Sequence, residues 1–174
     1  MNMKFLSVIA ITFLPIVANG ALPFVGLYQT IDDETNLPKS VVQLYQYQDG
    51  DDTELAGRIV ALYGTDGTIS ETIAKPVRVA DAVKGAPQMV GLDIIWAMEW
   101  DEKENKFEDG KIMDPKSGKI YSSVIWQDTP NVLSVRGKIG PFGRTQKWNE
   151  INTNDLPAEL QNIDTSTWNP VIHK

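Results

Sequence analysis

The sequence predicts an all-β domain built as an antiparallel up-and-down β-barrel of about eight strands. From residue 24 onward, apolar and polar residues alternate with a period of two, which is typical of strands with one face in a core. The alternating segments are short, and the segments between them are rich in Asp, Asn, Gly and Pro, which favour turns. Because most of these connections are short enough for hairpins, they favour an up-and-down barrel over a Greek key.

Turn-forming residues bound the predicted strands. In chain order, the short connecting segments read DDETNLP, QDGDD, DEKEN, DPKSG, DTP and GPF. The strands are expected at residues 24–31, 40–47, 54–63, 88–98, 106–113, 119–127, 131–140 and 143–151. Eight such strands close around an interior that is either filled by side chains or hollow enough for one small ligand.

The segment 88–98 shows the alternation clearly. Large apolar residues, among them Trp96 and Met98, occupy every second position, with Gly91 and Asp93 between them. Side chains at alternate positions share one face of a strand, so we expect the large set to face the barrel interior. That set either lines a cavity for an apolar ligand or forms a packed core, which is the commoner outcome.

Two segments depart from the strand pattern. Residues 64–87 are long for a hairpin connection, and VRVADAVK within them, followed by Gly85, is expected to form one or two helical turns. Near the C-terminus, NDLPAELQNID is expected to form a short helix that begins at Asn154 or Asp155. Residues 152–174 are therefore assigned to a tail or short helix that packs on the barrel or trails from it.

The stretch GKIMDPKSGKIYSS resembles a phosphate-binding loop but is better explained as a turn. The preceding Gly110 lies eight residues before Gly118, where such a loop needs five, and Ile120 replaces the required hydroxyl residue after Lys119. Asp114 and Pro115 suit the first two positions of a type I turn, and Gly118 suits a left-handed conformation that closes a hairpin.

Residues 1–20 have the features of a secretory signal peptide. Lys4 supplies a short positive region, and the apolar run from Phe5 to Ala18 is shorter than the about 20 residues that span a bilayer. Small residues precede the expected cleavage after Gly20; the alternative is a buried N-terminal helix. We therefore expect a barrel domain of residues 21–151 that is periplasmic or secreted.

Composition excludes several kinds of chemistry and partner. The chain has no Cys and one His, His173, which excludes disulfides, thiol chemistry and zinc sites built on these residues. The net charge of −7 disfavours nucleic acid and anionic lipid surfaces as partners. Beyond the signal peptide, nothing is long and apolar enough for a membrane anchor. No cofactor or metal is expected.

Two acidic segments are candidates for Ca²⁺ binding, but turns explain them better. Residues 32–34 offer three consecutive carboxylates, and an Asx-type turn with a solvated acidic tip is the favoured interpretation. Residues 49–54 begin like an EF-hand loop but lack Gly at its sixth position, so they are expected to form a hairpin tip.

Three motifs carry a resemblance to a known family. They are GLYQTIDDETNLPKSVVQLY (26–45), GKIMDPKSGKIYSSVIW (110–126) and VRGKIGPFGRTQKW (135–148). With these motifs, the chain resembles the bacterial secreted family catalogued as domain of unknown function 2147. The resemblance implies a small, exported, lipocalin-like β-barrel, and no activity is assigned to the family.

The resemblance also suggests a pair of structural residues. In the first strand, Tyr28 stands where the family usually has Trp, and Arg144 of the last strand would pack on it through a cation–π contact. Many members carry a Cys pair in the connection that corresponds to residues 77–87. This chain lacks both cysteines.

Our sequence-based hypothesis is a non-enzymatic barrel that binds a small apolar or amphipathic molecule in its interior. Arg136 is expected to orient the ligand through a carboxylate, because Arg pairs with carboxylates bidentately. Tyr28, Trp96 and Tyr121 would line the wall, and Arg144 either contacts the ligand or packs on an aromatic ring.

Two alternatives remain open at this point. One is an envelope protein with a filled core that interacts through its outer surface. The other is a carboxylate-dependent hydrolase using Asp33 and Asp114, which requires both acids in one cleft. Because segment 119–127 has apolar residues on both faces, we expect its outer face to be covered by the tail or by a second copy in a homodimer.

Overall fold

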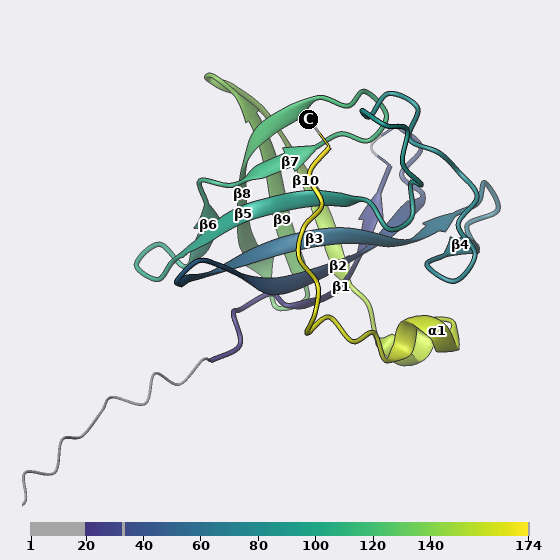
Figure 1. The fold of residues 1–174 in the computed structure, drawn as a ribbon, viewed down its shortest axis with the longest axis horizontal. Coiled ribbons are helices and arrows are strands. Elements are labelled where there is room, and N and C mark those ends of the chain that lie inside the picture. The colour runs from purple at the N-terminus through teal and green to yellow at the C-terminus, as the bar shows by residue number, and fades with distance from the viewer. Residues whose placement is uncertain (1–19, 33, 174) are drawn as a thin grey trace, which may run out of the picture.

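The fold is known from a computed structural model that describes residues 20–32 and 34–173. The predicted signal peptide lies almost entirely outside these residues. The described chain forms a single ten-stranded antiparallel sheet with a short helical segment near its end (Figure 1). The strands are β1 (Gly26–Ile31), β2 (Pro38–Asp49), β3 (Asp52–Tyr63), β4 (Ile69–Thr72), β5 (Asp93–Asp101), β6 (Lys106–Glu108), β7 (Lys111–Met113), β8 (Ile120–Thr129), β9 (Val132–Ile139) and β10 (Phe142–Glu150).

The sheet closes on itself through β1, which pairs with β2 on one side and with β10 on the other. The ring then runs through β3, β5, the short strands β6 and β7, β8 and β9 before it returns to β10. β6 and β7 share one place between β5 and β8, so the closed barrel has eight strand positions, and β4 lies beside β3 outside the ring. The predicted all-β barrel of about eight antiparallel strands is confirmed.

A close backbone approach explains why the predicted strand 106–113 is split. Between β6 and β7, a Cβ atom at Gly110 would lie 2.7 Å from the carbonyl oxygens of both Trp96 and Ala97. Asp109, just before it, has a φ of 61°, in the left-handed region. The strand therefore bends here, and only glycine allows this contact with β5.

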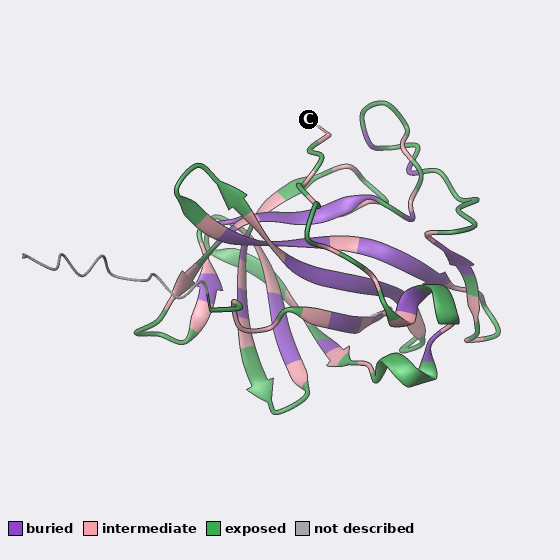
Figure 2. Cartoon of the chain, turned by 60° about the horizontal axis from the view of Figure 1, so that its bottom comes forward, coloured by how far each residue is buried: buried purple, intermediate pink, exposed green. Residues whose placement is uncertain are grey.

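The barrel interior is filled with apolar side chains over most of its depth, and Figure 2 shows buried residues along the strands and exposed residues at the turns. At the end where the chain enters, Phe24, Trp100 and Phe107 form an aromatic plug with ring centroids 4.9–5.7 Å apart. Large side chains fill the middle, among them Leu44, Leu55, Met98, Ile125, Leu133 and Trp148.

The connection between β3 and β5 contains no helix, so the helical turns predicted there are wrong. Residues 69–72 instead form β4, and the following segment, which we call the rim loop (residues 73–92), folds into turns. The Glu71 carboxylate accepts the backbone N–H groups of Val77 and Arg78, which the predicted helix would have left without helical partners. Ala80 and Met89 donate to backbone carbonyls across the loop, and residues 88–92 belong to it rather than to β5.

The C-terminal tail packs on the outside of the barrel. A 3-10 turn, Thr153–Asp155, is capped by Asn152, and helix α1 (Ala158–Gln161) follows, so the predicted short helix exists but begins later than expected. Leu156 and Leu160 join a second apolar cluster with Leu27, Val41 and Val60, on the face of β1–β3 that points away from the interior.

Beyond α1, a strap (residues 162–173) crosses the outer face of β2, β3 and β5 (Figure 1). Its Trp168 ring lies 4.3 Å from the guanidinium carbon of Arg58 and edge-on to Tyr45. The buried Asp93 carboxylate accepts hydrogen bonds from Tyr45 and Arg58, and from the backbone N–H of Val171. The strap is therefore fastened by a buried, fully paired charge.

We expect adjacent substitutions on β8 to differ in their cost. Ile125 is fully buried in the interior, whereas Val124 is half-buried on the outer face. Ile125→Ala should lower the free energy of unfolding by about 2–5 kcal/mol, because it leaves a cavity. Val124→Ala should cost about 1 kcal/mol or less. Urea denaturation measures both, and equal costs would contradict this assignment of faces.

Candidate ligand-binding site

The strand register determines which side chains of β7–β10 face the interior. Ile125, Leu133 and Val135 belong to the buried core. Alternate positions of each strand share a face, and residues paired across strands lie on the same side of the sheet. The inward set is therefore Ile112 on β7, Tyr121, Ser123 and Ile125 on β8, Leu133, Val135 and Gly137 on β9, and Arg144, Gln146 and Trp148 on β10.

Burial of this inward set falls towards one end of the barrel. Leu133 and Trp148 are fully buried, whereas Tyr121 and Gln146 are half-buried and Arg144 is exposed. Inward-facing side chains are accessible only where the barrel is open. We call this end the mouth and define it by Ile112, Tyr121, Gly137, Arg144 and Gln146.

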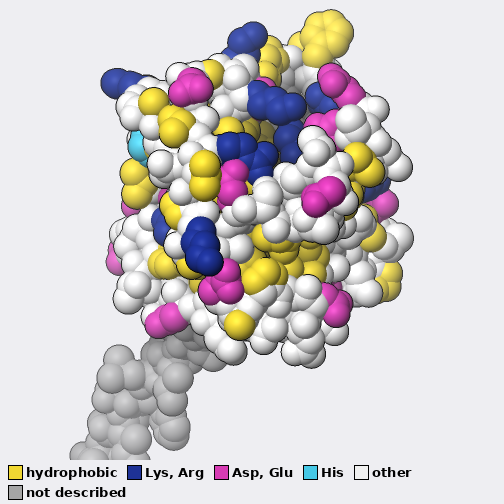
Figure 3. Space-filling model, turned by 90° about the vertical axis from the view of Figure 1, so that its right-hand side faces the viewer, with side chains coloured by type: hydrophobic (Ala, Val, Ile, Leu, Met, Phe, Trp, Pro, Cys, Tyr) yellow, Lys and Arg dark blue, Asp and Glu magenta, His cyan; other side chains and the backbone are white. Residues whose placement is uncertain are grey.

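The mouth lies where the β1–β2 loop, the β7–β8 turn and the rim loop meet. Lys116 of the turn lies 3.9 Å from Asp32 of the loop. Gly118 packs against the backbone of Ala82 in the rim loop. Viewed from the right-hand side of Figure 1, this face has a hollow with hydrophobic side chains on its floor and Lys and Arg side chains around it (Figure 3).

Gly137 brings together two of the residues proposed from the sequence. It is paired with Arg144 on β10, and a Cβ atom there would lie 3.5 Å from that of Tyr121 and 3.3 Å from a methyl group of Ile112. The absence of a side chain lets Tyr121 and Ile112 lie close over β9. Ile112, Tyr121 and the backbone of Arg144 thus lie around Gly137 at the mouth.

Tyr28 faces the interior but lies far from Arg144. It belongs to the inner apolar cluster, and its neighbour Leu27 belongs to the outer one. Tyr28 is opposite Glu150, six positions along β10 from Arg144, or about 20 Å. The cation–π pair of Tyr28 and Arg144 implied by the resemblance is therefore wrong. The cation–π contacts of the described residues instead join Arg58 to Trp168 and Tyr45.

Trp96 and Arg136 do not lie at the mouth. Trp96 is buried in the same apolar cluster as Tyr28 and is paired with Lys111, whereas its neighbour Ile95 is paired with the mouth residue Ile112. Arg136 alternates with the inward residues Val135 and Gly137, and its guanidinium group lies over Gly143 on the outer face. The expectation that Arg136 faces the interior is therefore wrong, whereas Trp96 is a buried core residue that does not lie at the mouth.

Sequence reasoning did not single out three residues of this region: Ile112, Ser123 and Gln146. The alternation of faces could have indicated two of them. Ser123 lies two residues from Tyr121 on β8, and Gln146 lies two residues from Arg144 on β10, so each shares a face with a residue that was proposed. Among the described residues, the Ser123 hydroxyl is the buried side-chain polar atom without a hydrogen-bond partner. A buried hydroxyl in this state is available to a water molecule or to a polar ligand atom.

The acidic segments form turns, as their sequences predicted. Asp32 accepts the backbone N–H groups of Glu34 and Thr35, and these hydrogen bonds hold the pKa of its carboxyl group below the ordinary value. Gly50 and Asp51 connect β2 to β3 as a hairpin tip. Asp33 lies outside the described residues, so its approach to Asp114 is untested.

The segment Asp114–Gly118 is the predicted turn. The Asp114 backbone carbonyl accepts the N–H groups of Ser117 and Gly118, and Gly118 has a φ of 67°. The Asp114 carboxylate accepts from the Lys116 N–H and the Ser117 hydroxyl. This carboxylate therefore stabilises its own turn.

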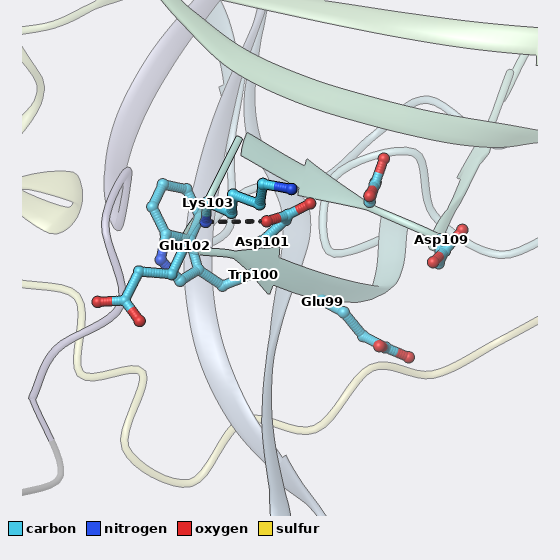
Figure 4. A pocket seen from close by; sticks show the side chains of 7 residues that line it. Glu99, Trp100, Asp101, Glu102, Lys103 and Asp109 are labelled. Carbon is cyan, nitrogen blue, oxygen red and sulfur yellow. Dashed lines mark hydrogen bonds between the residues drawn. The ribbon is translucent and has the colours of Figure 1, made fainter. Parts of the chain in front are cut away.

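Two further depressions lie on the outer surface. One, of about 540 Å³, is lined by residues at the β5–β6 turn, including Glu99, Trp100, Asp101 and Asp109 (Figure 4). The other, of about 640 Å³, lies between Tyr63, Ile69 and the start of the tail. Within residues 20–32 and 34–173, no group of His, Asp or Glu side chains is arranged to hold a metal ion.

A closed eight-stranded antiparallel barrel with an apolar interior and one open end defines a lipocalin-like protein. The chain belongs to the family described as "Uncharacterized protein conserved in bacteria (DUF2147)", whose model matches residues 26–150. The family suggested by the sequence motifs is thus confirmed, and the match ends where β10 ends.

A solved structure shares the fold. Its title reads "Protein HP1028 from the human pathogen Helicobacter pylori belongs to the lipocalin family", and it is similar with a TM-score of 0.52 at 16% sequence identity. The similarity covers 78% of this chain and 93% of that chain. No curated protein matches the sequence. In the described part of the chain, no helix has the length and hydrophobicity to cross a membrane.

Burial should make Tyr28 visible in the alkaline stability of the protein. Burial, with the nearby Glu150 carboxylate, raises the pKa of Tyr28 to about 12. Because the pKa of Tyr28 is higher in the folded than in the unfolded protein, the neutral hydroxyl favours the folded state. This contribution to the free energy of unfolding is complete below about pH 10, the ordinary pKa of Tyr, and is lost between about pH 10 and 12. In urea denaturation, Tyr28→Phe should flatten the loss of stability over this range. A loss as steep as that of the unchanged protein would contradict burial of the hydroxyl.

Proposed function

We propose that this protein binds a small, partly apolar molecule at the mouth of its barrel. The observation that carries the proposal is the partial exposure of inward-facing side chains at this end, in contrast to the filled interior beyond them. An apolar ligand that enters the mouth removes this surface from water, which favours binding by about 25 cal/mol per Å².

The chemistry of the mouth suits an amphipathic molecule. Ile112 and the Tyr121 ring supply apolar contact area. Arg144 provides a charged group at the entrance, and the Ser123 hydroxyl provides a polar atom at the inner limit. A few polar groups in a largely apolar wall are typical of small-molecule sites, where they set the orientation of the ligand. Of the residues proposed from the sequence, Tyr121 and Arg144 therefore remain the best candidates.

We favour binding without catalysis. The hydrolase hypothesis requires a carboxylate that faces the mouth with another acid beside it, and the Asp114 carboxylate is engaged in its own turn. The lipocalin-like fold and a family without an assigned activity are consistent with a binding protein. Export by the signal peptide of residues 1–20 remains part of the proposal.

A filled interior supports a second candidate, an envelope protein that acts through its outer surface. Leu44, Ile125 and Trp148 are fully buried in the middle of the barrel and leave the mouth as a shallow site. This candidate predicts that no small apolar molecule stabilises the protein.

Laurate binding distinguishes the two candidates. We expect laurate to raise the melting temperature of the protein, because a ligand that binds only the folded state stabilises it. Tyr121→Ala should weaken laurate binding about tenfold through the loss of apolar contact. Trp126→Ala is the matched control, since Trp126 is half-buried on the outer face of the same strand, and it should leave the affinity unchanged. An unchanged melting temperature across apolar probes of several lengths would favour the surface-interaction candidate.

A further inference from the structure

The hairpin between β9 and β10 ends in an exposed apolar tip. Ile139 and Phe142 are paired across the turn formed by Gly140 and Pro141, and their side chains are 60% and 79% exposed. Gly140 has a φ of 55°, which suits the first central position of a type II′ turn, and Pro141 fixes the second. The tip projects from the barrel at the upper left of Figure 1. Two large apolar side chains are thus held side by side in solvent by a rigid turn.

The tip continues the inner face of the mouth. Ile139 follows Gly137 by two residues on β9, and Phe142 precedes Arg144 by two residues on β10. Side chains two residues apart in a strand share a face, so both apolar side chains lie on the side of the hairpin that lines the mouth. An apolar surface therefore leads from the tip to Tyr121.

The charge of this hairpin is opposite to that of the whole protein. Between Thr129 and Asn149 there are four basic residues, Arg136, Lys138, Arg144 and Lys147, and no Asp or Glu, whereas the chain carries a net charge of −7. Lys147 is paired with Asp128. Arg136 and Lys138 lie beside Gly143 on the outer face, within about 10 Å of the tip along the strand.

We propose that the β9–β10 tip docks the protein onto the surface of a lipid bilayer that contains anionic lipids. Apolar side chains on a projecting element enter the boundary between headgroups and acyl chains to a depth of about 5–10 Å. Ile139 and Phe142 occupy that depth, and Arg136 and Lys138 then lie at the headgroups, where the anionic lipids attract their positive charges.

The acidic remainder of the molecule favours one orientation. An anionic surface repels the net negative charge of the chain, so the basic hairpin is the part that approaches it. Docking by the tip places the mouth next to the bilayer. The docking inference does not rest on ligand binding at the mouth. If the mouth binds an apolar ligand, docking shortens the path of that ligand from the membrane.

Vesicle co-sedimentation tests the proposal with the whole mature chain. The probe is vesicles of phosphatidylcholine and phosphatidylglycerol in equal parts. We expect the unchanged protein to bind them, and Phe142→Ser to weaken binding about tenfold through lost apolar burial. Val171→Ser is the matched control, because Val171 is an apolar side chain with 59% exposure on the strap, across the barrel from β9 and β10, and it should bind like the unchanged protein. Arg136→Gln with Lys138→Gln should reduce the salt dependence of binding.

Several results would overturn the proposal. These are absence of the unchanged protein from the vesicle pellet, or equal weakening by Phe142→Ser and Val171→Ser. A dimer that forms with rising concentration, disappears in Phe142→Ser and does not sediment with vesicles would assign the tip to contact between two copies. Phe142→Ser and Val171→Ser both alter exposed side chains, so their melting temperatures should match that of the unchanged protein and exclude misfolding as the cause.

Discussion

Closure of the sheet by β1 is the constraint on which the rest of this structure depends. β1 is paired with β2 and with β10, so the first and last strands of the barrel meet and neither leaves an edge open. Closure gives each strand an inner and an outer face. A one-residue error in register is therefore strongly destabilising, because an apolar side chain would exchange places with a polar one. The aromatic plug, the filled middle and the open mouth are regions of one enclosed face.

The outer face is organised by a different interaction, the buried carboxylate of Asp93. This group accepts hydrogen bonds from β2, β3 and the strap, which joins the last residues of the chain to the middle of the barrel wall. Breaking such a network leaves an unpaired buried charge, which typically costs about 3–5 kcal/mol. The family match ends at β10, so the strap lies outside the matched residues.

The strands and turns were largely predictable from the sequence, because alternation and turn residues are local signals. The Asp114–Gly118 turn illustrates this, since Asp, Pro and Gly stand at the positions that the turn requires. The rim loop was not predictable, because VRVADAVK has local helical character while its backbone pairs across the loop, where Ala80 donates to the Pro87 carbonyl and Met89 to the Arg78 carbonyl. Tertiary contacts overrode local propensity there.

The candidate site was only partly predictable for the same reason. Tyr121 and Arg144 lie on either side of Gly137, a relation that depends on the pairing of three strands. Trp96 was expected at the ligand site from strict alternation, but it is buried in the core and paired with Lys111, while its neighbour Ile95 is paired with Ile112 of the mouth. Arg58 and Trp168 lie 110 residues apart in the chain, and nothing local in either segment indicates their stacking.

The most direct test of this account is to map where a ligand sits on the barrel. In a two-dimensional NMR titration of ¹⁵N-labelled protein with laurate, the account predicts shifts of the backbone amides of Ile112, Tyr121, Ser123, Gly137 and Gln146, which define and adjoin the mouth. Shifts confined to the outer-face depressions near Glu99 or Tyr63, or no shifts at saturating laurate, would contradict it.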